Sequence, residues 1–238
     1  MKKIAVLIPC YNEELTVDQV INEFKSKLPD AEIYVYDNNS TDKTLKIASN
    51  NPNCIVRTCK IQGKGAVVKQ MLSEIDADIY VMTDGDATYN AKHVNEMIDL
   101  IKANSYDMIT GDRLSGSYQN QKMTHTFGNH LVDWLIKTKF KNANIKDTMS
   151  GLRVFNKKIA KGFAEYAKYN GFEIETELVI YCANQNARLF SIPCDYANRP
   201  DGSVSKLNTF KDGWKIIKLI LKTKRIKHSK TQKEGNAS

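Results

Sequence analysis

No run of apolar residues in the chain approaches the roughly 18 to 20 that a helix needs to cross a bilayer. The sequence also lacks internal repeats and any low-complexity linker, which predicts one main domain, residues 1–207, followed by a short basic appendage, residues 208–238. The cysteines are scattered, odd in number and without the spacing of metal ligands, so reduced thiols in a cytoplasmic protein are the simplest interpretation. They are Cys10, Cys54, Cys59, Cys182 and Cys194.

Acidic residues are scarce at the C-terminal end, where basic residues accumulate. From Lys206 onward there are ten Lys and Arg residues against Asp212 and Glu234, so this segment carries a net charge of +8, the formal charge of the whole chain. The part before it is therefore close to neutral. Such a segment predicts contact with an anionic surface. It contains no recognisable nucleic-acid recognition module, so nucleic acid is not an expected partner.

Apolar segments alternate with amphipathic ones along the first half of the sequence. This pattern predicts strands at residues 3–9, 32–37, 54–57 and 78–83 and helices at residues 11–28, 43–50 and 63–75. The alternation is typical of an α/β fold with a mostly parallel, doubly wound sheet flanked by helices. The second half is less regular. Its predicted strands are 106–110, 151–155 and 189–194, and its predicted helices are 124–140, 173–183 and 209–222, with a polar loop at 111–120.

Two aspartates follow the predicted fourth strand. Asp84 and Asp86 are separated by Gly85, so alternation places both on the same side of the chain at the carboxyl end of the strand. Ligands of open α/β sheets bind at that edge. Two carboxylates with open positions suit Mg²⁺ or Mn²⁺ shared with substrate phosphates, and Gly85 lets a diphosphate approach the backbone. An acidic turn that caps a helix is the alternative for a motif this short.

Two further motifs are expected near the same edge. Asp37 ends the second predicted strand, where its carboxylate can accept hydrogen bonds from a base or a ribose; alternatively it only orders the turn after it. Gly63-Lys64-Gly65 opens a predicted helix whose N-terminus favours an anion, with Lys64 within reach of a phosphate. This motif lacks the spacing of a P-loop and lies too late in the chain for a dinucleotide fingerprint.

Several motifs in a fixed order resemble a known family. They are residues 8–14 (IPCYNEE), 36–44 (YDNNSTDKT), 84–86 (DGD), 111–113 (GDR), 147–155 (DTMSGLRVF), 171–178 (GFEIETEL) and 199–207 (RPDGSVSKL). Together they resemble the signatures of family 2 inverting glycosyltransferases with the GT-A fold. The motifs of the second half resemble the branch that contains dolichol-phosphate mannose synthases and bacterial polyprenyl-phosphate sugar synthases. The resemblance covers about Lys3 to Trp214 and implies that residues 1–207 form a Rossmann-like GT-A catalytic domain.

The resemblance implies a pocket for a nucleotide-sugar donor. Asp86 would ligate the metal directly, and Asp84 would lie near the donor ribose, the diphosphate and the metal. Relatives usually have Gln two residues after the second aspartate, whereas Thr88 stands here, so the third protein ligand stays open. The full set of expected donor-binding residues is Pro9, Tyr11, Glu13, Asp37, Lys64, Asp84, Gly85 and Asp86.

The acceptor side follows from the chemistry of phosphate. A lipid phosphate has a second pKa of about 6, so it is already an anionic nucleophile and needs positioning and charge neutralisation more than a strong base. Arginine suits this task through bidentate geometry. The residues expected to bind the acceptor phosphate lie in the matching motifs: Arg113, Ser150, Arg153, Arg199, Ser205 and Lys206.

A saccharide acceptor would change the assignment. A sugar hydroxyl requires a general base, for which Asp147 is the candidate; its alternative role is to cap the loop that holds Arg153. Asp84, Asp86, Asp147 and Arg153 are therefore the predicted catalytic residues. Glu175 and Glu177 either orient the arginines or form the solvated side of a helix.

Two segments bear on a membrane. Residues 131–141 and 210–222 each interleave apolar side chains, including Trp134 and Trp214, with lysines. Both are typical of amphipathic helices at a membrane interface, or alternatively of helices that pack their apolar face into the core. Many members of the branch carry C-terminal transmembrane helices, so two alternatives are open: a membrane-anchoring partner protein, or a C-terminal membrane anchor that has been removed from this chain.

The preferred hypothesis is an inverting, metal-dependent glycosyltransferase. It would move a sugar from a nucleotide donor, UDP-sugar favoured and GDP-mannose as the alternative, to polyprenyl phosphate (undecaprenyl or dolichyl) at the inner face of the membrane. One rival is a transferase that extends a saccharide hydroxyl in capsule or wall polysaccharide synthesis. The other is a catalytically inactive nucleotide-binding or membrane scaffold protein, against which the intact Asp84, Asp86, Arg113 and Arg153 argue.

Overall fold

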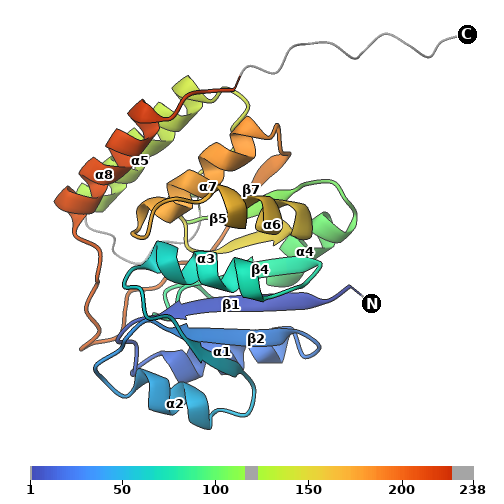
Figure 1. Cartoon of the computed structure of the whole chain (residues 1–238), viewed down its shortest axis with the longest axis vertical. Coiled ribbons are helices and arrows are strands. Elements are labelled where there is room, and N and C mark those ends of the chain that lie inside the picture. The colour runs from blue at the N-terminus through green and yellow to red at the C-terminus, as the bar shows by residue number, and fades with distance from the viewer. Residues whose placement is uncertain (1, 116–122, 227–238) are drawn as a thin grey trace, which may run out of the picture.

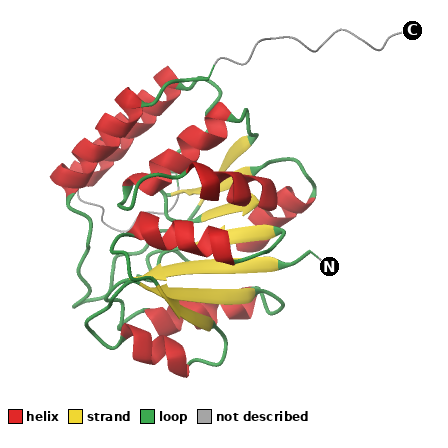
Figure 2. Cartoon of the chain, viewed as in Figure 1, coloured by secondary structure: helices red, strands yellow, loops and turns green. Residues whose placement is uncertain are grey.

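One seven-stranded sheet runs through the computed structural model, which describes residues 2–115 and 123–226 (Figures 1 and 2). Its strand order is β3-β2-β1-β4-β6-β5-β7. Only β6 runs antiparallel to its neighbours β4 and β5, and the other pairings are parallel. The strands are β1 (Ile4–Cys10), β2 (Glu32–Asp37), β3 (Ile55–Thr58), β4 (Ile79–Met82), β5 (Met108–Asp112), β6 (Arg153–Asn156) and β7 (Leu189–Pro193). The mostly parallel α/β sheet expected from the sequence is confirmed.

Helices cover both faces of this sheet. Along β1, Ala5 and Leu7 enter one hydrophobic cluster while Val6 and Ile8 enter the other, because successive side chains point to opposite faces. A sheet buried on both faces needs such continuous apolar strands. The helices are α1 (Val17–Lys27), α2 (Thr44–Asn50), α3 (Lys64–Glu74), α4 (Val94–Lys102), α5 (Met123–Lys139), α6 (Lys157–Tyr166), α7 (Glu173–Asn184) and α8 (Thr209–Lys222).

Several predicted boundaries were wrong. The first helix begins at Val17 rather than at residue 11, because Asn12 takes a left-handed φ of 53° and donates its backbone N–H to Ser40 Oγ. The loop before α1 is thereby fixed to the loop after β2. Helices α4 and α6 were missed, although α4 shows buried side chains at helical spacing. The predicted loop 111–120 lies partly outside the described residues.

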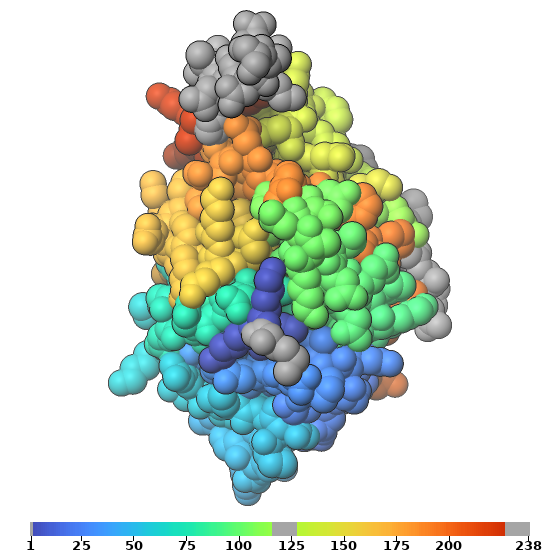
Figure 3. All heavy atoms as spheres, turned by 90° about the vertical axis from the view of Figure 1, so that its right-hand side faces the viewer, coloured from blue at the N-terminus to red at the C-terminus, as the bar shows by residue number. Residues whose placement is uncertain are grey.

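The carboxyl ends of the parallel strands meet at one edge of the sheet. Cys10 at the end of β1 is paired in register with Asp37 at the end of β2, and β4 ends at Met82 two residues before Asp84. Since β6 is antiparallel, it begins at this edge, and the loop before it contributes Asp147 to Leu152 there. At the other end, where the parallel strands begin, the segments around residues 104–107 and 186–188 lie side by side and are joined by hydrogen bonds from Arg188 (Figure 3).

Helices α5 and α8 lie side by side beyond α7 (Figure 1). Lys139 Nζ donates to the carbonyls of Ile220 and Leu221, each at 2.7 Å, which joins the ends of the two helices. Each helix buries one face, so the sequence-based alternative that these helices pack an apolar face into the core is correct for that face. The buried apolar side chains are Val132 and Ile136 of α5, Phe140 directly after it, and Ile216, Leu219 and Ile220 of α8. Residues 227–238 of the predicted basic appendage lie outside the described residues, and its division from the main domain stays a prediction.

The outer faces of α5 and α8 remain exposed and carry aromatic side chains. Trp134 is 61% exposed, Phe210 90% and Trp214 66%. Lysines 211, 218 and 222 of α8 are exposed as well. Within the described ranges, no helix combines the length and the apolar character needed to cross a membrane.

Candidate active site at the carboxyl edge of the sheet

A pocket of about 950 Å³ opens at the carboxyl edge of the sheet. Most of the residues predicted for the site line it: Pro9, Tyr11, Glu13, Lys64, Asp84, Gly85, Asp86, Arg113, Arg199, Ser205 and Lys206. Lining residues that the sequence reasoning did not assign to the site include Asn38, Gln62 and Tyr196. Four predicted residues do not line it: Asp37, Asp147, Ser150 and Arg153.

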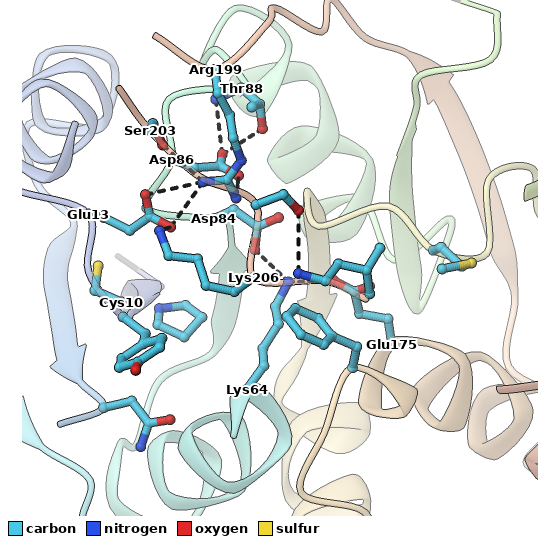
Figure 4. Close-up of a pocket in the computed structure, with 18 of the residues that line it drawn as sticks. Cys10, Glu13, Lys64, Asp84, Asp86, Thr88, Glu175, Arg199, Ser203 and Lys206 are labelled. Atoms are coloured by element: carbon cyan, nitrogen blue, oxygen red, sulfur yellow. Dashed lines mark hydrogen bonds and ion pairs between the residues drawn. The ribbon is translucent and has the colours of Figure 1, made fainter. Parts of the chain in front are cut away.

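The two aspartates after β4 each pair with a cation of the chain (Figure 4). Asp84 Oδ1 lies 2.5 Å from Lys64 Nζ, and Asp86 Oδ2 lies 2.5 Å from Arg199 Nη2. Burial and the charge of Asp84 raise the pKa of Asp86. Burial also acts to raise the pKa of Asp84, but the adjacent Lys64 ammonium outweighs it and the net pKa is lowered. The site therefore holds two close carboxylates in a place that attracts positive charge.

These carboxylates fit a divalent metal ion. Both supply hard oxygen ligands at the pocket wall, and both already bind cations. In the part of the chain that the structure describes, no group of three or more His, Cys, Asp or Glu side chains is placed to hold a metal. Thr88 donates its hydroxyl to Asp86 Oδ1 at 2.6 Å, so it supports that aspartate. An ion here would complete its coordination with substrate oxygens and water, as Mg²⁺ commonly does.

Lys64 is a bridge between carboxylates. Its ammonium lies 2.5 Å from both Asp84 Oδ1 and Glu175 Oε1 (Figure 4). Burial acts to lower the pKa of Lys64, but the two carboxylates outweigh it and the pKa is raised. The expected anion site at the start of α3 is not free, because the Asn170 carbonyl accepts hydrogen bonds from the N–H groups of Gly65 and Ala66.

Asn38 lines the pocket, and its neighbour Asp37 is buried at the end of β2. Asp37 is 3% exposed; its Oδ2 accepts a hydrogen bond from the Ser40 N–H, and its Oδ1 is buried with no hydrogen-bond partner among the described residues. Asp37 therefore does order the turn after β2 through Oδ2, while its Oδ1 has no hydrogen-bond partner among the described residues. Asn38 accepts from the Gly63 N–H and donates to the carbonyls of Cys59 and Ile61. It joins the loops after β2 and β3 across the pocket wall.

Asp147 holds Arg113 in place. Its two oxygens accept from Arg113 Nε at 2.6 Å and Nη2 at 2.7 Å, and Asp147 itself is 0% exposed. The guanidinium also lies 5.9 Å from the ring centroid of Tyr89 and 5.2 Å from that of Tyr196. This geometry argues against Asp147 as a base, because both oxygens of the buried carboxylate are bound by Arg113 and do not face the pocket.

Arg153 and Ser150 support the loop before β6. Arg153 is 0% exposed and donates to the carbonyls of Ser150 at 3.0 Å and Thr148 at 2.5 Å. Burial lowers the pKa of Arg153, although Glu175 and Asp147 act in the opposite direction. Ser150 is also 0% exposed. In this arrangement neither side chain lines the pocket, which favours a structural role over the expected contacts with an acceptor phosphate.

The acidic residues at the start of α7 are buried. Glu175 is 6% exposed and binds Lys64; Glu177 is 2% exposed and accepts from the N–H groups of Lys168 and Tyr169. The alternative of a solvated helix face is therefore wrong for both. The sequence pattern of the helix does not show that Glu175 and Glu177 are buried, because their partners lie in other segments of the chain.

Glycines allow the close approach of these groups. A Cβ added to Gly151 would lie against the carboxylate of Asp84, and one added to Gly85 would meet Cys10 Sγ at 2.6 Å. Both are closer than side-chain atoms tolerate. The glycine of the 147–155 motif is thus required by the aspartate of the 84–86 motif.

A mostly parallel α/β sheet with two aspartates and several cations around a pocket at its carboxyl edge is compatible with a GT-A glycosyltransferase. The chain belongs to glycosyl transferase family 2, whose model matches residues 5–163. It is 30% identical over 215 residues to glycosyltransferase AglJ of Haloferax volcanii, covering 88% of this chain and 68% of that relative. It is 27% identical over 225 residues to the dolichyl-phosphate hexose transferase of the same organism, covering 92% of each.

The fold is also similar to a solved structure. Glucosyl-3-phosphoglycerate synthase from Mycobacterium tuberculosis, in complex with Mn²⁺, UDP-glucose and phosphoglyceric acid, superposes with a TM-score of 0.72. The sequences are 18% identical, and the match covers 92% of this chain and 79% of that chain. At this identity the likeness concerns the fold. The GT-A fold and the family expected from the motifs are confirmed.

Proposed function

We propose that the protein transfers a sugar from a nucleotide-sugar, UDP-sugar favoured over GDP-mannose, to polyprenyl phosphate with inversion at the anomeric carbon. The observation that carries this proposal is the contrast between the cations and the base candidate. Arg113, Arg199 and Lys206 line the pocket, whereas Asp147 is buried and bound by Arg113. Such a pocket suits an acceptor that arrives as an anion and needs no strong base.

Each group has a role in this reaction. Pro9, Tyr11 and Glu13 would line the nucleoside part, with the free oxygen of Asp37 as an acceptor below it. Asp84 and Asp86 would hold Mg²⁺ or Mn²⁺, which when bound stabilises charge on the leaving diphosphate. The cations that line the pocket would position the acceptor phosphate, and Ser205 is placed to assist.

The relatives agree with this acceptor. The name of one relative, the dolichyl-phosphate hexose transferase, specifies a polyprenyl phosphate, and the match to that protein covers nearly the whole chain. The Mn²⁺ and UDP-glucose in the solved structure are compatible with the donor and the metal proposed here. Both points concern other proteins and support the proposal by similarity.

The exposed faces of α5 and α8 would bring the protein to the inner face of the membrane. Leu207 lines the pocket and α8 begins two residues later, so the exposed Phe210 and Trp214 continue from the pocket rim. Aromatic side chains between lysines suit the interface of an anionic bilayer. This placement would let the phosphate of a lipid enter the pocket while its chain stays in the bilayer. The alternative is a membrane-anchoring partner protein.

A transfer assay tests the reaction. Purified protein with Mn²⁺ is offered radiolabelled UDP- and GDP-sugars and a short-chain polyprenyl phosphate, and label is followed into an acid-labile product in the organic phase. Asp86→Asn is expected to lower transfer by about 10²-fold or more. Asp76→Asn is the matched control, since Asp76 is exposed and does not line the pocket. Donor turnover with a saccharide but none with the lipid phosphate would contradict the proposed acceptor.

A further inference from the structure

A single segment places two cations on the carboxylates of the pocket. We call residues 198–207 the cationic strap, since it crosses the pocket after the short bridge between Tyr89 and Tyr196. Arg199 Nη2 lies 2.5 Å from Asp86 Oδ2, and its Nη1 lies 3.2 and 3.3 Å from the two oxygens of Glu13 (Figure 4). Lys206 Nζ lies 2.9 Å from Glu13 Oε1 and 2.6 Å from the Asn12 carbonyl.

The two oxygens of Asp86 have different partners. Oδ1 accepts the hydroxyl of Thr88 at 2.6 Å and the Thr88 N–H at 3.1 Å. Oδ2 is the oxygen that Arg199 binds. The side chain of Asp86 is 6% exposed, so a charge there needs a partner that stays in contact with it. A metal ion that reaches Asp86 must therefore take the oxygen on which the guanidinium lies.

We propose that Arg199 and a divalent cation exclude each other at Asp86, so that the cationic strap closes the site before metal and donor bind and is displaced when they do. This inference rests on the proposed metal site at Asp86. Displacement would exchange one positive partner of the carboxylate for another. It would also free Arg199 at the rim of the pocket, where the acceptor phosphate is expected.

The strap has the structure of a segment that can move. It contains no helix or strand, and none of its residues is buried. Gly202 takes a left-handed φ of 87°, which gives the backbone a turn that other residues resist. A second cavity of about 370 Å³ lies between the strap and the loop before α1, lined by residues that include Leu15, Gly202 and Val204. The strap therefore has space to move into beside the loop that it contacts.

The test is the affinity of the full chain for Mn²⁺ alone, measured from the electron paramagnetic resonance signal of free Mn²⁺. Arg199→Gln is expected to bind Mn²⁺ roughly fivefold or more tightly than the original chain, because the competing cation is gone. Arg199→Lys keeps a positive charge and is expected to change the affinity less. Arg188→Gln is the matched control, because Arg188 pairs with Asp107 and does not line the pocket.

The outcomes separate the strap from the metal site. If Arg199→Gln binds Mn²⁺ equally or more weakly while Asp86→Asn still abolishes binding, the proposed competition between Arg199 and the metal is wrong and the proposed metal site is retained. If Asp86→Asn leaves Mn²⁺ binding unchanged, or if neither the original chain nor any variant binds Mn²⁺, both the proposed metal site and the proposed competition with Arg199 are wrong. Tighter binding in Arg199→Gln but not in Arg188→Gln supports the inference.

Discussion

The ammonium of Lys64 and the carboxylate of Asp84 lie 2.5 Å apart, and Glu175 shares the same ammonium at 2.5 Å. Lys64 opens α3, Asp84 follows β4 and Glu175 lies in the first turn of α7. The Lys64 and Glu175 side chains are 11% and 7% exposed, and Asp84 is 24% exposed. One lysine thus fixes the first aspartate of the site to a helix from the second half of the chain.

Removing this lysine leaves two nearly buried carboxylates without their cation. Lys64→Met is expected to lower the free energy of unfolding at neutral pH by about 3 kcal/mol. In the variant the folded-state pKa of both carboxyls rises above the unfolded value, so the folded protein binds more protons and the loss shrinks as the pH falls towards 5. Urea denaturation at both pH values checks this.

Lys92→Met is the control for that experiment. Lys92 pairs with Asp195 but is 62% exposed, so its loss is expected to cost less than about 1 kcal/mol at either pH. Adding Glu175→Gln to Lys64→Met should restore part of the stability. Equal losses in the two lysine variants would show that the bridge is not a structural requirement.

Asp147 separates the two acceptor hypotheses. If it only positions Arg113, Asp147→Asn should raise the KM for polyprenyl phosphate more than it lowers kcat, and the acidic limb of the pH profile, where a general base would become protonated, should keep its shape. A general base contributes about 10²- to 10⁴-fold, so a fall in kcat of that size with a changed pH profile would reinstate the saccharide hypothesis. Steady-state kinetics on the purified variant supply both measurements.

Gly151 is predicted to be essential because of Asp84. Gly151→Ala places a methyl group against the Asp84 carboxylate and should cost about 2 kcal/mol and weaken Mn²⁺ binding. Gly213→Ala is the matched change within α8, where nothing lies within 4 Å of an added Cβ, and it should be neutral or stabilise by about 0.5–1 kcal/mol. Thermal unfolding and Mn²⁺ titration of the two variants provide the comparison.

The outer face of α8 is predicted to bind anionic membranes. Trp214→Ala should weaken co-sedimentation with phosphatidylglycerol vesicles by roughly tenfold without loss of fold, since this side chain is 66% exposed. Ile61→Ala is the control: Ile61 lies in a loop outside α8, its side chain is 62% exposed, and its removal should leave vesicle binding unchanged. Added salt should weaken vesicle binding by the original chain and by Ile61→Ala alike, because lysines contribute to this binding. Absence of vesicle binding by the original chain would favour an anchoring partner protein.

Much of the fold and part of the site follow from local patterns. The alternation of apolar and amphipathic segments predicted the α/β sheet, and the position of Asp84 and Asp86 after a buried strand predicted their place at its carboxyl edge. Helices α4 and α6 were also within reach of this reasoning, since their buried residues recur at helical spacing. Most of the residues carried over from the family motifs do line the pocket.

What the sequence by itself determined was which residues gather at the pocket edge, because strand ends and loops depend on neighbours along the chain. Only the tertiary structure decided what those residues contact. Arg113 and Arg153 look alike in the sequence, yet one lines the pocket and the other is fully buried. Lys64 meets Glu175 across 111 positions, and Arg199 meets Glu13 across 186. Burial and charge pairing at such separations depend on how the layers pack, and no local period records that.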